Sequence, residues 1–341
     1  MRVVDMRSDT LTMPTPEMRK AMAGAELGDD VFGEDPTVNR LQEVAAERLG
    51  KEAGIFVSSG TMGNLVGILV NARSGEEVIA DADSHVFLNE AAGSATLGGI
   101  QIMPIKTERG LMTPEQVREA IRPDDQHQPR TAAVTFEDTH NRHGGIAWPL
   151  ADLRAAATAA RERGLAVHLD GARIFNAAVA TGVDVKEIAA TADTVTFCLS
   201  KGLGAPAGSV LTGPKDKIAA ARRWRKMLGG GMREVGMLAA AGLVALDTMV
   251  DRLAEDHANA RTLAEALAEM DGVRVELDRV QTNLVFFEVD SMPPERFLAE
   301  CRARGLRAEA SGRKIRFVTR HGIDAGDVQQ ALAVVAEVLS T

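Results

Sequence analysis

The chain has little or nothing of several features that mark particular protein classes. It has no tyrosine, and its two cysteines, Cys198 and Cys301, are too few for a disulfide framework, which favours a reducing compartment. No apolar run reaches the roughly 18 residues that a membrane crossing needs. The N-terminal segment MRVVDMRSDTLT lacks the apolar core of a secretory signal. We therefore expect a cytoplasmic protein with no membrane partner.

An excess of positive charge is missing as well. The net charge of −9 argues against a general binder of nucleic acids or anionic membranes. Hydrophobic residues make up 45% of the chain and charged residues 26%, as in an ordinary enzyme with a sizeable core. A length of 341 residues is enough for two domains.

From about residue 55 onward, short apolar runs alternate with longer stretches of helical periodicity. This alternation predicts an α/β domain with a mainly parallel sheet and helices on both faces. The expected strands are Ile55–Val57, Glu77–Ala80, Ile100–Ile105, Ala132–Phe136, Leu165–Leu169, Val195–Leu199 and Gly208–Leu211. The expected helices are Thr15–Gly24, Thr37–Leu49, Gly63–Ala72, Pro114–Ile121 and Leu150–Arg163.

The last third of the chain has a different pattern. One long alanine-rich helical stretch, Arg233–Leu267, is expected to link the domains. The segments after it predict a small α+β domain, with strands at Val273–Leu277, Asn283–Val289 and Ile315–Val318 and helices at Pro294–Arg304 and Asp324–Leu339. We therefore expect an N-terminal arm at residues 1–14, a large domain at 15–250 and a small C-terminal domain at 251–341.

A lysine and an aspartate follow two of the expected strands. Lys201 comes after the β-branched run TVTFCLS and opens a glycine-rich turn, and Asp170 ends the run GLAVHLD. About one strand–helix–strand repeat separates them, so a parallel sheet would bring both to the edge where ligands bind. Pyridoxal phosphate (PLP) needs this pair, a lysine for the Schiff base and an acid facing the pyridine nitrogen. The pair predicts PLP chemistry on an amino acid.

The segment SSGTMGN, which contains Gly60 and Thr61, follows a strand and opens a helix. Free backbone N–H groups at a helix N-terminus suit a phosphate, although such turns also cap helices that bind nothing. His85 follows the next strand, where an imidazole could stack on a flat cofactor and move a proton. His127 lies in a segment that otherwise looks solvated, and a lone histidine is more often a satisfied loop residue.

His140 and His143 lie near Glu137 and Asp138 in EDTHNRHGG, which raises the question of a metal. The spacing does not match the common zinc patterns, so a polar loop that braces the site is favoured and no metal is expected.

Three basic features remain. The run RRWRK, which ends at Lys226, and the following GGGMR, which ends at Arg233, favour a solvated helix face that contributes charge to a phosphate. Arg173, three residues after Asp170, could pair with a cofactor or a carboxylate. Arg316 interrupts the strand KIRFVT, and an arginine in this setting is either an exposed edge residue or a bidentate clamp for an α-carboxylate.

Taken together, these motifs closely resemble the low-specificity threonine aldolases, which belong to the β-eliminating lyase group of fold-type I (aspartate aminotransferase-like) PLP enzymes. The likeness runs nearly end to end, and HLDGAR with SKGLGAP at this spacing is highly specific. The matching segments are RSDT, GDDVFGEDPT, SSGTMGN, DSHVF, EDTHNR, HLDGARIFNA, CLSKGLGAPAGS, RRWRKMLGGGMR and IRFVT.

The resemblance implies roles for the cofactor-binding positions. Lys201 would carry the cofactor, Asp170 would face the pyridine nitrogen, and His85 would stack on the ring. Gly60 and Thr61 would hold the phosphate. Two further residues match positions that reach a phosphate across a subunit interface, which implies a dimer as the minimal active unit and a tetramer as the expected assembly: Lys226 and Arg233.

The resemblance also implies the substrate contacts. Ser8, Arg173 and Arg316 match carboxylate-binding positions, with Arg173 also near the cofactor, and His127 matches a histidine near the substrate hydroxyl. The implied reaction is a reversible retro-aldol cleavage of L-threonine or L-allo-threonine to glycine and an aldehyde. The β-hydroxyl would lose its proton to His85, to His127 or to a water that they hold.

The chain departs from the family pattern at Phe32 and Asn89, where tyrosine is usual. The loss of two hydroxyls should leave the lysine chemistry intact but could change the substrate pocket.

Two other classes of function stay open at this point. Another PLP-dependent lyase, a racemase or an aminotransferase would use the same lysine and aspartate. A nucleotide-binding protein without PLP would use GLGAPAG or LGGGM as its phosphate loop, but neither segment matches a P-loop or a full dinucleotide fingerprint.

Overall fold

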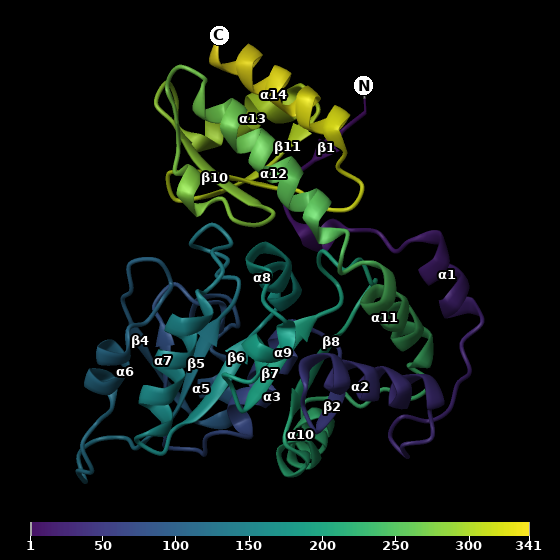
Figure 1. Ribbon diagram of the computed structural model, residues 1–341, viewed down its shortest axis with the longest axis vertical. Helices are drawn as coiled ribbons and strands as arrows, with labels where there is room; N and C mark the ends of the chain where they lie inside the picture. Colours follow the sequence, from purple (N-terminus) through teal and green to yellow (C-terminus); the bar gives the residue numbers. More distant parts are fainter. Residues whose placement is uncertain (1, 341) are drawn as a thin grey trace.

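A computed structural model describes residues 2–340 and shows a large body with a smaller one above it (Figure 1). The end residues of the expected arm and of the expected small domain, 1 and 341, lie outside the described part. Among the described residues, no helix has the length and hydrophobicity that a membrane crossing requires.

A seven-stranded sheet forms the centre of the large body in the described chain. Its spatial order is β2 (Ala53–Val57), β8 (Ser209–Gly213), β7 (Thr194–Cys198), β6 (Ala166–Asp170), β5 (Thr131–Glu137), β3 (Glu77–Asp81) and β4 (Gln101–Ile105). Strand β8 runs antiparallel to its neighbours β2 and β7, and the pairs from β7 to β4 are parallel. The expected mainly parallel sheet and all seven of its expected strands are confirmed.

Both faces of this sheet are buried, which explains why its strands are rich in apolar residues. Phe56 and Ile79 belong to the core on one face, and Ile55 and Val78 belong to cores on the other. Adjacent residues of a strand point to opposite faces, so a strand covered on both sides is rich in apolar residues, and the polar residues that interrupt these strands, such as His168 and Thr196, are buried as well.

Helices cover the two faces of the sheet (Figure 1). One face carries α1 (Pro16–Ala23), α2 (Pro36–Leu49), α6 (Pro114–Ala120), α7 (Leu150–Arg161), α8 (Ile174–Thr181), α9 (Val185–Ala189) and α11 (Gly236–Thr248). The other carries α3 (Gly60–Leu69), α4 (His85–Leu88), α5 (Gly93–Gly98) and α10 (Lys215–Met227).

The small body contains an antiparallel sheet in the order β12 (Glu309–Ser311), β13 (Lys314–Val318), β10 (Leu284–Val289) and β9 (Val273–Val275). Its other elements are α12 (Leu253–Ala268), the short 3₁₀ helix η2 (Leu277–Arg279), α13 (Pro294–Ala303), β11 (Leu306–Arg307) and α14 (Ala325–Leu339). The N-terminal strand β1 (Val4–Asp5) pairs with β11, and η1 (Asp9–Leu11) follows it. Val4 and Met6 are buried in the core of the small body, so the arm is anchored there.

The expectation of one helix over Arg233–Leu267 is wrong. The chain forms α11 and α12 with a break at residues 249–252. Met249 and Leu253 are buried in the core of the large body. Leu263 and Leu267 are buried in the core of the small body, so the chain changes direction between the two cores. We propose that the large domain ends at this turn.

Two glycines let α3 approach the sheet closely. A Cβ added at Gly63 would overlap Thr196 of β7, and one added at Gly67 would overlap the ring of His168 on β6. This close approach determines where the N-terminus of α3 meets the carboxyl ends of the strands.

We expect Gly67→Ala to lower the free energy of unfolding by up to about 2 kcal/mol. Alanine favours a helix by about 1 kcal/mol over glycine, but overpacking against a buried ring costs about 1–3 kcal/mol. Gly93→Ala in α5 is the matched control, because its Cβ would make only ordinary contacts with Leu65. Urea denaturation of both variants measures the effect, and a stabilised Gly67→Ala would contradict the close packing.

Candidate active site

Lys201 and Asp170 meet at the carboxyl edge of the sheet, as the sequence predicts. Asp170 ends β6 and pairs in register with Thr196 of the adjacent parallel strand β7, and Lys201 lies three residues beyond the end of β7. The Asp170 carboxylate is buried and accepts hydrogen bonds from Asn64 Nδ2 at 2.8 Å and from the Ala172 N–H at 3.1 Å. Its position is therefore fixed from two sides.

His85 lies at the start of α4, beyond the end of β3. Its backbone N–H donates to Glu137 Oε2 at 2.7 Å, and its ring Nδ1 lies 2.8 Å from Glu90 Oε1. The hydrogen bond to Glu90 raises the pKa of His85 against the effect of burial, and the charges of Asp170 and Lys201 act on the ring in opposite directions. His85 therefore lies within electrostatic reach of both predicted key residues.

Glu90 and Asn64 are site residues that the sequence reasoning missed. Asn64 Nδ2 donates to Glu90 Oε1 and to Asp170 Oδ2, both at 2.8 Å, and so links the two carboxylates. Burial raises the pKa of the Glu90 carboxyl, and the negative charge of Asp170 adds to this effect. A signal was present in the sequence, since Asn64 ends SSGTMGN and Glu90 follows His85 by five residues.

The N-terminus of α3 offers donors for an anion, as predicted for Gly60 and Thr61. Ser59 caps the helix by accepting from the Met62 N–H, which leaves the N–H groups of the first turn available. A Cβ at Gly60 would lie 2.8 Å from Cys198 Sγ and 3.8 Å from Ser209 Oγ, so only glycine fits here. Ser209 Oγ is buried and makes no hydrogen bond among the described residues.

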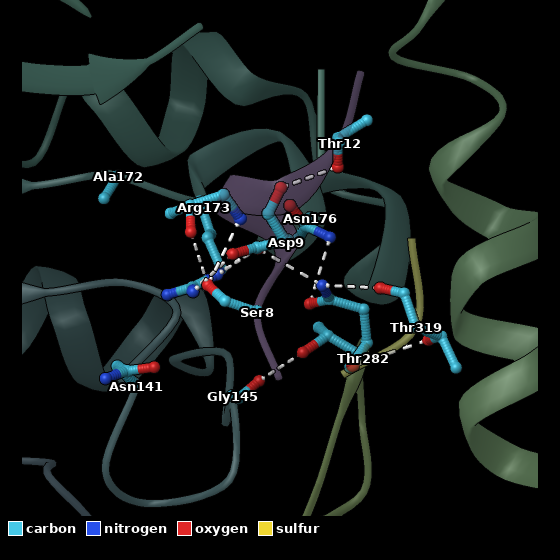
Figure 2. Close-up of polar contacts among 12 residues, drawn as sticks. Ser8, Asp9, Thr12, Asn141, Gly145, Ala172, Arg173, Asn176, Thr282 and Thr319 are labelled. Atoms are coloured by element: carbon cyan, nitrogen blue, oxygen red, sulfur yellow. Dashed lines mark hydrogen bonds and ion pairs between the residues drawn. The ribbon is translucent and has the colours of Figure 1, made fainter. Parts of the chain in front are cut away.

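Arg173 is held by an acid that the sequence reasoning did not identify. Its Nε and Nη2 donate to the two carboxylate oxygens of Asp9 at 2.7 and 2.9 Å, and both side chains are buried. Figure 2 shows this pair beside Ser8, and Thr319 lies to the right of Asp9 in this view. Burial by itself would raise the pKa of the Asp9 carboxyl. The Arg173 guanidinium outweighs this effect of burial and holds that pKa well below its usual range. Of the guanidinium nitrogens, Nη1 is the one that Asp9 does not engage.

Arg316 reaches the site from the small domain. It lies in β13, and its Nη2 donates to Glu309 Oε2 and to the Arg7 carbonyl, both at 2.8 Å. Its Nε is buried and has no hydrogen-bond partner among the described residues, so the guanidinium retains donor capacity. The strand position is therefore not an exposed edge.

Six of the predicted site residues line one cavity of about 230 Å³: Ser8, His85, Asp170, Arg173, Lys201 and Arg316. They come from the N-terminal arm, the edge of the large sheet and the small domain. Asn89, one of the two departures from the family pattern, also lines it and accepts a hydrogen bond from Arg142 at 3.2 Å.

Gly60 and Thr61 are not among the residues that line this cavity, and three further predicted residues lie away from it at exposed positions. The His127 side chain is 79% exposed and lies 2.8 Å from Asp125 Oδ1. Lys226 is exposed at the end of α10. Arg233 pairs with Asp29 at 2.7 Å and lies over the ring of Phe32, the other departure from the family pattern.

Comparisons with known proteins agree with this geometry. The family model for β-eliminating lyases matches residues 5–290. The low-specificity L-threonine aldolase of Escherichia coli K12 is 50% identical over 288 residues, which cover 84% of this chain and 85% of that protein. The probable low-specificity L-threonine aldolase 2 of Arabidopsis thaliana is 45% identical over 343 residues, which cover 97% of this chain and 96% of that protein.

A solved structure extends the agreement to the fold. The threonine aldolase of Leishmania major superposes with a TM-score of 0.84 over 98% of this chain and 99% of that one, at 20% identity. The expected fold-type I class is thereby confirmed. Because the family model covers most of the chain and the relatives match along its length, this chain belongs to the β-eliminating lyase family.

Proposed function

We propose that this protein is a PLP-dependent aldehyde lyase that reversibly cleaves L-threonine and L-allo-threonine to glycine and acetaldehyde. The observation that carries the proposal is the convergence of Lys201, Asp170 and His85 on one cavity that Arg316 also lines. The names of the relatives from E. coli and A. thaliana support the substrate class.

The residues present fit PLP. Lys201 supplies the amine for covalent attachment, and Asp170 supplies the buried carboxylate that keeps a ring nitrogen protonated. The unpartnered Ser209 hydroxyl and the first N–H groups of α3, at Gly60 and Thr61, suit the phosphate. When bound, PLP supplies an electron sink that stabilises negative charge at the substrate Cα.

His85 is the proposed carrier of the β-hydroxyl proton. The Glu90 carboxylate accepts at Nδ1, which favours the tautomer with the proton on that nitrogen and leaves the lone pair of Nε2 free. A base in this state can take the hydroxyl proton directly or through a water that it shares with His127.

Two arginines are the proposed binders of the α-carboxylate. Arg316 retains donor capacity at the cavity, and Arg173 lines the same cavity with Nη1 not engaged by Asp9. Ser8 adds a hydroxyl beside them. Fixed guanidinium groups orient the amino acid because they bind a carboxylate at a defined angle.

The proposed active unit is a homodimer, within a tetramer. Three predicted residues are exposed and do not line the cavity of their own chain, which supports their acting in the site of a second subunit: His127, Lys226 and Arg233. Phe32 and Met227, next to these basic residues, are 72% and 66% exposed, as expected of an interface.

The proposed setting is the cytoplasm, with a free amino acid as the partner and no nucleic acid or membrane. Cys198 and Cys301 are buried and unpaired, which suits a reducing compartment. The net charge of −9 disfavours polyanions.

We expect Asp170→Ala and Asp170→Asn to slow cleavage of threonine by at least about a hundredfold, equivalent to about 2.7 kcal/mol in the barrier. Neither side chain carries the charge that keeps a ring nitrogen protonated. The measurement is the release of acetaldehyde and glycine from L-threonine without added keto acid. Asp278→Asn, at a position 67% exposed, is the control and should match the wild type. Wild-type rates in Asp170→Ala would contradict the assignment, and a requirement for a keto acid would favour an aminotransferase.

Subunit complementation tests the shared site. Lys201→Ala and Arg233→Ala should each be nearly inactive alone. Co-expression should restore about a quarter of the wild-type activity, because half of randomly formed dimers are hybrids and each hybrid has one intact site. Co-expression of Lys201→Ala with Asp170→Ala is the control and should restore nothing, since both changes fall in the same chain's cavity. A lack of recovery in the first pair would show that Arg233 does not act across an interface.

A further inference from the structure

Four potential metal ligands gather beside the active site at the ends of two neighbouring strands. Asp81 ends β3 and Asp83 follows it, while His140 and His143 lie in the loop after β5. The ligand atoms of Asp81, His140 and His143 all lie within 4.8 Å of one another. The fold thus combines a D-x-D segment and an H-x-x-H segment.

The distances within this group suit a small tetrahedral ion. His140 Nε2 lies 3.1 Å from Asp81 Oδ1, and His143 Nε2 lies 3.4 Å from Asp83 Oδ2. An ion bound at about 2.0–2.1 Å by four ligands in a tetrahedron separates them by about 3.3–3.4 Å. These two separations are close to this value. The ligand atoms of Asp81, His140 and His143 already lie together, whereas Asp83 approaches the group through His143, so its half-exposed side chain would have to turn toward the ion to complete the coordination.

The group is also incompletely satisfied by protein hydrogen bonds. His143 Nε2 is buried and makes no hydrogen bond to any described residue. The His140 side chain is fully buried, and its Nδ1 also has no such partner. An unsatisfied buried nitrogen costs about 1–3 kcal/mol, which an ion bound at His143 Nε2 would offset.

Hydrogen bonds from the surrounding residues orient Asp81. Its Oδ2 accepts from Thr107 Oγ1 at 2.6 Å, and its Oδ1 accepts from the Asp83 N–H at 2.8 Å. Such outer contacts are typical of metal-binding carboxylates. A cavity of about 230 Å³ lined by Asp83 and His143 provides a path of entry.

We propose that Asp81, Asp83, His140 and His143 bind one Zn²⁺ ion. Two imidazoles with two carboxylates suit zinc, whereas Mg²⁺ and Ca²⁺ prefer oxygen ligands alone. All four positions are filled by protein, as in structural zinc sites, so the ion stabilises the fold and performs no chemistry.

The ion ties together two loops that carry the active site. His85 lies two residues after Asp83, and Glu137, which accepts from the His85 N–H, lies three residues before His140. Zinc therefore fixes the position of the loop after β3 relative to the loop after β5. This inference rests on the four side chains and does not depend on the proposed reaction.

The sequence pattern favoured a bracing loop because its spacing does not match the common zinc patterns, and Glu137 and Asp138 were the acids considered beside these histidines. Glu137 accepts from the N–H groups of His85 and Asn141, and Asp138 accepts from the Trp148 N–H at 3.2 Å. The carboxylates that pair with the histidines, Asp81 and Asp83, lie at the end of β3 and just after it, more than fifty positions earlier in the chain.

Calorimetric titration of ZnCl₂ into chelator-treated, PLP-loaded protein tests the site. We expect about one Zn²⁺ bound per chain with a higher thermal midpoint, and no comparable effect of MgCl₂. Asp83→Asn, whose side chain is 52% exposed, and the near-isosteric His143→Gln should each weaken binding by at least about tenfold. His321→Gln, at an exposed position in the small domain, is the matched control and should bind like the wild type.

Cobalt gives a second readout that does not depend on stability. Co²⁺ in a tetrahedral site should produce strong visible absorption in the wild type and in His321→Gln, and His143→Gln should lose it. Absence of saturable Zn²⁺ binding, or binding that survives unchanged in both Asp83→Asn and His143→Gln, would overturn the proposal.

Discussion

A buried ion pair between Asp9 and Arg173 holds the separate parts of the active site together. Asn283, directly before β10 of the small domain, donates to the same Asp9 carboxylate at 3.3 Å and to the Thr319 carbonyl at 3.1 Å. The N-terminal arm, helix α8 and the small domain therefore meet at one carboxylate (Figure 2). Removal of one partner of such a pair leaves an uncompensated buried charge and costs about 3–5 kcal/mol.

The rest of the site follows from this constraint. The ion pair holds the arm and the small domain over the sheet edge, so Ser8 and Arg316 line the same cavity as Lys201. In a second network, Asn64 joins Asp170 to Glu90, and Glu90 in turn contacts the His85 ring. The two networks have different roles. The Asp9 network positions the groups proposed to bind a carboxylate, and the Asn64 network positions the groups proposed to hold a proton.

Sequence reasoning predicted the parts of this arrangement that local pattern determines. Lys201 and Asp170 were identifiable because each follows an apolar β-branched run, and parallel strands end at one edge. Asp9 was missed because its partners Arg173 and Asn283 are far away in the sequence. Glu90 was missed because local pattern does not show that Asn64 links it to Asp170. The break between α11 and α12 was also missed, because helical periodicity does not show that the two helices pack into different hydrophobic cores.

Asp9→Asn tests the central claim most directly, because asparagine keeps the shape of Asp9 and removes its charge. We expect the free energy of unfolding to fall by about 3–5 kcal/mol and KM for threonine to rise, since Arg173 loses its anion and the N-terminal arm loosens. Glu265→Gln, which removes the charge from an exposed ion pair with Arg261, should change stability by no more than about 0.5 kcal/mol. An Asp9→Asn variant with wild-type stability and wild-type KM would show that the site does not depend on this ion pair.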